Sequence, residues 1–174
     1  CVKVIDGKCP KYITGLVRPT DVELLGDIVA KEEQGQNGYC AVYAHNAGSL
    51  VRLSKRGSLT VSLKVLEYEV YTVSPIKDYN HSISFAPLGL IDMYNAGAAI
   101  QSVEYADNDK GLVKMRMRGC GRFGAYTSKK PKRCLVNMKE ALLSYDNVNC
   151  LLTFTIPFVS SMDKVFSHEV KIEF

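Results

Sequence analysis

The feature that most constrains the fold is an apolar–polar alternation with a period of two residues. Leu59, Val61, Leu63 and Val65 alternate with polar side chains, which is typical of a strand with one buried face. The pattern returns over residues 113–118 and 166–174. Roughly a dozen short strands separated by turn sequences indicate an all-β fold, a mostly antiparallel β-sandwich.

The alternation changes phase after Val65. From Leu66 onward the apolar residues Leu66, Tyr68 and Val70 occupy even positions, whereas before it they occupy odd ones. Because a one-residue slip moves every side chain to the other face of a strand, we predict a bulge or tight corner near Val65–Leu66, with the strand series continuing beyond it.

Turn-forming residues and one helical segment punctuate the strands. Thr20 and Glu23 form a capping box, and Val22, Leu25 and the following apolar residues recur at helical spacing, so we predict one short helix near residues 21–30. The composition indicates turns at Asn46-Ala47-Gly48, Arg56-Gly57, Asn95-Ala96-Gly97, Asp107 to Gly111 and Asp146-Asn147.

The bulk composition is that of one globular domain. The chain has 174 residues, 47% of them apolar and 23% charged, which is enough to bury a core. We therefore treat residues 1–174 as a single domain. No apolar run approaches the roughly 20 residues that span a bilayer, so we expect no membrane partner. Because the sequence begins at Cys1, we expect a processed product or a piece of a longer protein.

Residues 119–124, Gly-Cys-Gly-Arg-Phe-Gly, match the G-x-G-x-x-G pattern of dinucleotide-binding turns. That turn works only between a strand and a helix, whose amide groups bind the pyrophosphate. No apolar helical stripe follows Gly124, so we predict that these glycines relieve crowding in a strand or bulge. We therefore expect no cofactor.

The positive charge is concentrated between Lys110 and Arg133. This segment has nine cations and no acid, and because the net charge is +4, −5 remains on the rest of the chain. Three interpretations stay open: a solvated surface, a face that docks an acidic partner, and a nucleic-acid patch. No groove-entering helix or aromatic array accompanies the charges, so we expect no nucleic-acid partner.

The residues supply no recognisable catalytic or metal constellation. The twelfth position of a calcium loop starting at Asp107 would be Arg118, which cannot ligate a cation. The histidines His45, His81 and His168 have no nucleophile partner, and we expect them to be satisfied or solvated. Glu67 and Glu69 form only an ordinary surface pair on one face of a strand. We assign no catalytic, cofactor-binding or metal-binding residue.

The six cysteines form no C-x-x-C pair and no zinc-like cluster with histidine. Their density is far below that of disulfide scaffolds. We predict reduced, mostly buried thiols in a reducing compartment, and a cytoplasmic location.

Several sequence blocks, taken in this order and spacing, resemble the C-terminal region of the plant raffinose synthase and seed imbibition protein family, which includes the alkaline α-galactosidases. "YITGLVRPTDVELL" (12–25) resembles the family segment that leads into this region. The remaining blocks are "CAVYAHNAGSLVRL" (40–53), "LKVLEYEVYTVSPI" (63–76), "SFAPLGLIDMYNAGAAI" (84–100) and "MRGCGRFGAYTSKKPKRC" (117–134).

The resemblance implies that this chain is a β-sandwich accessory domain that follows a (β/α)8 catalytic barrel. It further implies retaining α-galactosyl transfer by two carboxylates of that barrel. None of the barrel motifs occurs here, so whether this chain alone is an enzyme is an open question.

Three functions follow as alternatives. The first is the C-terminal domain of a galactinol–sucrose galactosyltransferase, with its own barrel as partner and galactinol, sucrose and raffinose as sugars of the parent enzyme. The second is the same domain of an alkaline α-galactosidase. The third is an independent carbohydrate-binding module, which the absence of Trp disfavours although ten Tyr are present.

Overall fold

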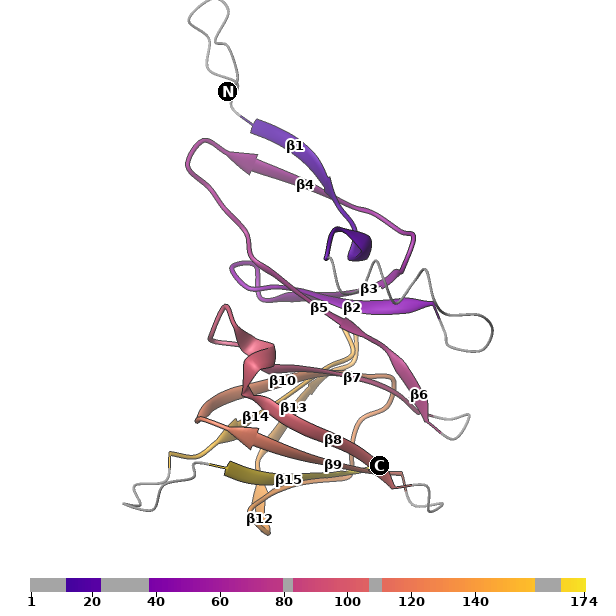
Figure 1. The fold of residues 1–174 in the computed structure, drawn as a ribbon, viewed down its shortest axis with the longest axis vertical. Coiled ribbons are helices and arrows are strands. Elements are labelled where there is room, and N and C mark those ends of the chain that lie inside the picture. The colour runs from indigo at the N-terminus through magenta and orange to yellow at the C-terminus, as the bar shows by residue number, and fades with distance from the viewer. Residues whose placement is uncertain (1–11, 23–37, 80–82, 107–110, 159–166) are drawn as a thin grey trace, which may run out of the picture.

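The computed structural model describes residues 12–22, 38–79, 83–106, 111–158 and 167–174, drawn as coloured ribbon in Figure 1. Two short 3-10 turns, η1 (Pro19–Asp21) and η2 (Ala96–Ala99), accompany the strands. The strands are β1 (Tyr12–Val17), β2 (Tyr39–Ala44), β3 (Ser49–Ser54), β4 (Leu59–Lys64), β5 (Tyr71–Pro75), β6 (Lys77–Tyr79), β7 (Ile83–Leu90), β8 (Ile100–Ala106), β9 (Leu112–Arg118), β10 (Gly121–Thr127), β11 (Arg133–Val136), β12 (Lys139–Ala141), β13 (Leu143–Asp146), β14 (Leu151–Ile156) and β15 (Ser167–Glu173).

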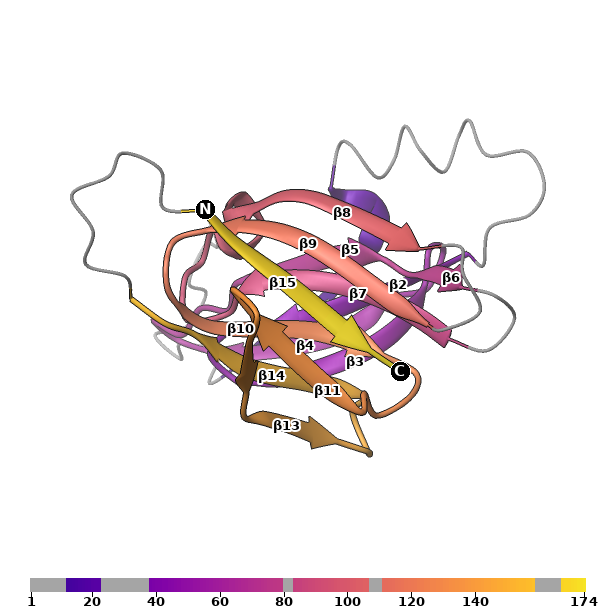
Figure 2. The same ribbon diagram turned by 90° about the horizontal axis from the view of Figure 1, so that it is seen from below.

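The strands form four stacked antiparallel layers, which Figure 1 shows from top to bottom. The top layer is a two-stranded ribbon, β1-β4, and beneath it lies the upper sheet, β3-β2-β5. The central sheet has the order β13-β14-β10-β7-β6, and the lower sheet has the order β12-β11-β15-β9-β8. Figure 2, seen from below, shows β15 in the middle of the lower sheet, between β9 and β11. The predicted antiparallel all-β fold is confirmed.

The main core lies between the central and lower sheets. Phe123 and Phe154 of the central sheet pack together with ring centroids 4.8 Å apart and ring planes tilted by 39°, and Met115 and Met117 of β9 are buried in the same cluster. The alternation predicted over 113–118 is confirmed, because Val113, Met115 and Met117 point inward while Arg116 and Arg118 stay exposed. Burial of these large side chains supplies the main stabilising free energy.

A second core lies on the other face of the central sheet, against the upper sheet. It includes Tyr43 and Leu50 from the upper sheet and Ala86, Leu88 and Ile91 from β7 and its end. Since β7 is covered on both faces, its sequence is a nearly continuous apolar run rather than an alternation. A register shift opposite Gly124 and Ala125 marks a bulge between β10 and β7.

The side chains of the β1-β4 ribbon are less buried than those of the other layers. β1 pairs only with β4, and none of its side chains is buried. The corner predicted near Val65–Leu66 is confirmed: the Glu67 amide donates to the Lys64 carbonyl oxygen over 3.1 Å, and Leu66 has φ +67°. The predicted continuation of the strand beyond it is wrong, because residues 67–70 form no strand and β5 begins only at Tyr71.

Two further predictions concern local helices. The predicted helix near residues 21–30 lies outside the described residues from residue 23 onward. At its start, η1 ends at Asp21, and the backbone of the next residue, Val22, is extended. The turn predicted at Asn95-Ala96-Gly97 is the beginning of η2, in which the Ala98 amide donates to the Asn95 carbonyl oxygen over 3.2 Å. Gly48 has φ +63°, as the turn predicted there requires.

Candidate functional site

The glycine motif at residues 119–124 connects two antiparallel strands. Gly119 (φ +83°) lies in the β9–β10 turn and Gly121 (φ +133°) begins β10, both in conformations that favour glycine. A Cβ added at Gly124 would lie 2.5 Å from Cγ2 of Ile91, so glycine also allows close packing here. The motif leads into β10 rather than a helix, and the predicted structural role is confirmed.

The basic segment does not form a continuous positive face. On the outer face of the lower sheet, Arg116 lies opposite Glu169 and Lys114 lies opposite Glu104. The Lys171 ammonium, on the same face, forms an ion pair with Glu169 over 3.2 Å. Neighbouring strands thus intersperse acids among the cations of β9, which favours the solvated-surface interpretation.

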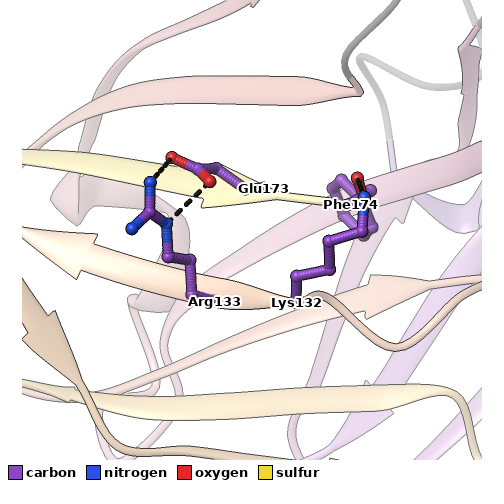
Figure 3. A network of polar contacts seen from close by, with 4 residues as sticks. All are labelled: Lys132, Arg133, Glu173 and Phe174. Atoms are coloured by element: carbon purple, nitrogen blue, oxygen red, sulfur yellow. Dashed lines mark hydrogen bonds and ion pairs between the residues drawn. The ribbon is translucent and has the colours of Figure 1, made fainter.

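The end of the segment is bound to the last strand, as Figure 3 shows. The Arg133 guanidinium donates to both carboxylate oxygens of Glu173, with Nε to Oε2 at 2.7 Å and one terminal nitrogen to Oε1 at 3.0 Å. Nζ of Lys132 donates to the Phe174 carbonyl oxygen over 2.7 Å. The hydrogen bond from Arg133 lowers the pKa of Glu173. The charged groups of Lys132 and Arg133 therefore bind other parts of the same chain.

The fold brings together two blocks that are far apart in the sequence, residues 43–48 and 91–97. Nδ1 of His45 donates to the Ile91 carbonyl oxygen at 3.1 Å, and its Nε2 lies 2.8 Å from the Thr72 hydroxyl. The His45 ring also meets Tyr94 edge-to-face, with centroids 5.7 Å apart. Of the two predicted states of His45, satisfied or solvated, the structure shows the satisfied one. Both blocks carry Asn-Ala-Gly, which indicates a turn in each of them but does not indicate that the two turns meet.

The carboxylate of Glu69 binds the backbone of the first of these two blocks, at the turn that contains Asn46 and Ala47. Its carboxylate accepts from the amides of Asn46 (2.8 Å), Ala47 (3.0 Å) and Val70 (2.9 Å). Burial raises the pKa of Glu69, but these amides and nearby His45 outweigh it, and the net pKa is below its ordinary value. The expectation that Glu67 and Glu69 share one face of a strand is wrong, because residues 67–70 form no strand. The Glu69 carboxylate therefore stabilises this turn through its hydrogen bonds to the backbone.

An open pocket of about 510 Å³ lies at one end of the sandwich, between η2, the β9–β10 turn and the start of β15. Apolar side chains such as Leu90, Met93 and Phe158 form most of its wall. Among the described residues that line it there is no Asp or Glu. Because glycoside chemistry normally uses two carboxylates that flank the scissile bond, this pocket does not provide that chemistry.

His168 is the buried polar residue of this pocket. It is only 3% exposed, and its Nδ1 accepts from the side-chain amide of Asn137 over 3.0 Å. Burial lowers the pKa of His168, which favours the neutral ring. Because Nδ1 accepts the hydrogen bond from Asn137, the proton of the neutral ring is on Nε2. Of the two predicted states, satisfied or solvated, His168 too has the satisfied one, whereas His81 lies outside the described residues.

The remaining site predictions concern metals and thiols. In the part of the chain that the structure describes, no cluster of three His, Cys, Asp or Glu residues could hold a metal ion. The turn at 107–110 lies outside that part. Among the described cysteines, Cys120, Cys134 and Cys150 are free thiols, of which Cys134 is buried, Cys150 half-buried and Cys120 exposed; Cys40 is also buried. The described helical segments are also too short to cross a bilayer.

Comparison with known proteins identifies the family. The family model described as raffinose synthase or seed imbibition protein Sip1 matches residues 3–156. This chain belongs to that family. The sequence resemblance to the raffinose synthase family is thereby confirmed.

The curated relatives of this raffinose synthase family chain are several times longer than it. A probable galactinol–sucrose galactosyltransferase 6 of Arabidopsis thaliana is 40% identical over 161 residues, which are 92% of this chain and 21% of the relative. The galactinol–sucrose galactosyltransferase of Pisum sativum is 33% identical, over 78% of this chain and 17% of its own length. The stachyose synthase of the same plant is 31% identical, over 75% and 15%. The chain spans about a fifth of the curated relatives it matches.

Proposed function

We propose that this chain is the C-terminal β-sandwich of a galactinol–sucrose galactosyltransferase, and that it supports a separate catalytic barrel. Its family membership over residues 3–156 is the observation that carries the proposal. Relatives named galactinol–sucrose galactosyltransferase match it over most of its length. In this proposal the sugars bind the parent enzyme, and the sandwich contributes stability and positioning.

The placement of the acids supports a structural role. Asp92 pairs with Arg122 over 2.7 Å, Glu173 pairs with Arg133, and Glu69 binds backbone amides. Asp146 caps its own turn through Val148 and Asn149. Carboxylates bound in this way are not arranged as an acid and a nucleophile across a sugar pocket.

The test compares the intact polypeptide with the 174-residue chain, each supplied with galactinol and sucrose. We expect raffinose from the intact polypeptide and none from the chain alone. Raffinose formed by the chain alone would overturn the accessory role. Free galactose in place of raffinose would assign the parent to the α-galactosidases instead. Calorimetry of the chain with millimolar raffinose separates the carbohydrate-module alternative, for which binding heat is required.

We also propose a reducing, cytoplasmic location, in keeping with the free thiols of Cys120, Cys134 and Cys150. Fractionation of plant cells with an antibody against the chain tests this location. Recovery of the protein in the secreted fraction would contradict it.

A further inference from the structure

The tip of the β1-β4 ribbon exposes apolar side chains from both of its strands. Tyr12 and Ile13 begin β1 and are each 57% exposed. Because Tyr12 lies opposite Lys64, the last residue of β4, the next residues Val65 and Leu66 lie at the same end of the ribbon. Figure 1 shows this ribbon as the layer farthest from the sandwich. Successive residues of a strand point to opposite faces, so both faces of the tip are apolar.

Leu66 is unusual for a leucine both in its exposure to solvent and in its backbone conformation. Its side chain is 97% exposed, and its φ is +67°. The third position of a turn with positive φ normally takes Gly or Asn, and a leucine there is a conformational outlier. Within this chain the side chain gains no burial in return. Local strain without local gain is typical of residues that serve a function outside their own domain.

The exposed apolar surface continues from the tip to the loop before η2. Tyr68 follows the corner by two residues, and its hydroxyl lies 3.0 Å from that of Tyr94. The two rings meet edge-to-face, and both are more than half exposed. We define the docking surface as Tyr12, Ile13, Val65, Leu66, Tyr68 and Tyr94.

The ribbon is also poorly supported from below. A cavity of about 300 Å³ lies between it and the upper sheet, with Val61 and Leu63 on one side and Val42 and Val51 on the other. A two-stranded ribbon is at best marginally stable in water. Additional contacts are therefore needed to hold it in one conformation.

We infer that the docking surface packs against the remainder of the longer family polypeptide, with the ribbon tip inserted into an apolar groove of that remainder. The inference rests on the proposed function, because it takes the catalytic part of the same polypeptide as the occupant. The curated relatives place about four fifths of their length outside the matched region.

The composition of the docking surface supports this occupant. Interface cores are enriched in Tyr and other aromatics and depleted in charge, and the docking surface is three tyrosines and three aliphatic residues. The outer face of the lower sheet, by contrast, alternates cations with Glu104, Glu169 and Glu173. The ribbon tip, rather than the basic segment, is therefore the docking face.

Hydrogen–deuterium exchange tests the inference on the intact polypeptide and on the 174-residue chain. We expect peptides covering 12–17 and 59–68 to exchange at least tenfold more slowly in the intact polypeptide. Peptides from β9 and β15 serve as the internal reference and should exchange equally in both. Equal exchange of the ribbon in the two forms would overturn the inference.

A matched pair of variants sharpens the test. Leu66→Asp places a charge in the docking surface, whereas Leu142→Asp changes a residue that is 96% exposed at the β12–β13 connection. In the intact polypeptide we expect Leu66→Asp to make ribbon exchange at least tenfold faster than in the unmodified protein, and Leu142→Asp to leave it unchanged. In the 174-residue chain neither variant should lower the melting temperature. Equal behaviour of the two variants in the intact polypeptide would contradict the inference.

Two outcomes separate the inference from the proposed function. Raffinose synthesis by an intact polypeptide whose ribbon stays unprotected would refute only the docking surface. A protected ribbon in a polypeptide that transfers no galactose would refute only the proposed activity. If the 174-residue chain alone protects its ribbon and elutes as a dimer, a second copy is the occupant and the inference is wrong.

Discussion

Gly89 of β7 faces the backbone carbonyl oxygen of Ala96 in η2 so closely that a Cβ on residue 89 would overlap that oxygen. Gly89 also has φ +97°, a conformation that only glycine adopts readily. This contact fixes the loop that carries Tyr94 against the central sheet.

The first prediction is that Gly89→Ala destabilises the chain by about 3 kcal/mol, through backbone strain and overpacking. Urea denaturation of the 174-residue chain measures the change. The control is Gly97→Ala, at a position where a Cβ would meet no atom within 4 Å, and it should change stability by less than about 1 kcal/mol. Equal losses for the two variants would contradict the prediction.

The second prediction concerns Leu66, whose positive φ disfavours a leucine. Leu66→Asn should stabilise the 174-residue chain by about 1 kcal/mol, because asparagine tolerates the left-handed region better. Thermal denaturation is the measurement. Leu142→Asn, at an equally exposed leucine without positive φ, should have no effect, and a loss of stability in Leu66→Asn would show that the leucine is needed within the chain itself.

A third prediction follows from the lowered pKa of Glu69. A carboxyl whose pKa is lower in the folded state stabilises the fold above its unfolded pKa and loses this contribution as pH falls through the folded pKa. Glu69→Gln should therefore cost about 1 kcal/mol at pH 7, a small value because solvent still reaches and screens the half-buried carboxylate. The difference should shrink as pH falls below the ordinary value of 4.5.

Denaturation curves of the unmodified chain and Glu69→Gln between pH 3 and pH 7 measure this difference. The control is Glu104→Gln, which alters an exposed acid of β8 and should leave the curves superimposed. A difference for Glu69→Gln that stays constant down to pH 3 would exclude the ionised carboxylate as its cause.

The fourth prediction compares two thiols. Cys120 is exposed in the β9–β10 turn, whereas Cys134 is fully buried and its burial raises the pKa to about 12. Since the thiolate is the reactive form, iodoacetamide at pH 8 should modify Cys120 at least about a hundredfold faster than Cys134. Peptide mapping by mass spectrometry identifies the site. Modification of both thiols at one rate in the folded chain would be incompatible with the structure.

The fifth prediction concerns the basic segment. Because acids of β8 and β15 lie between its cations, the chain should elute from immobilised DNA at low salt. Retention that falls steeply with salt concentration would reveal several phosphate contacts and would contradict this reading.

Much of the fold follows from the sequence. The alternation of Val113, Met115 and Met117 with cations defined β9 and its buried face, because a strand has a strict period of two. The missing helix after Gly124 identified the glycine motif as structural. The strand predicted through Leu66, Tyr68 and Val70 is wrong, because the hydrophobicity of these residues does not by itself distinguish a buried strand from an exposed irregular segment.

The sequence by itself determined the all-β class, most strand faces, the corner at Val65–Leu66 and the family. Only the tertiary structure decided which strands are neighbours, that His45 meets Tyr94, that acids intersperse the basic segment, and that the ribbon tip remains uncovered. The physical reason is range: alternation and turn chemistry act between residues a few positions apart, whereas pairing and exposure depend on segments that are distant in the chain and meet only when it folds.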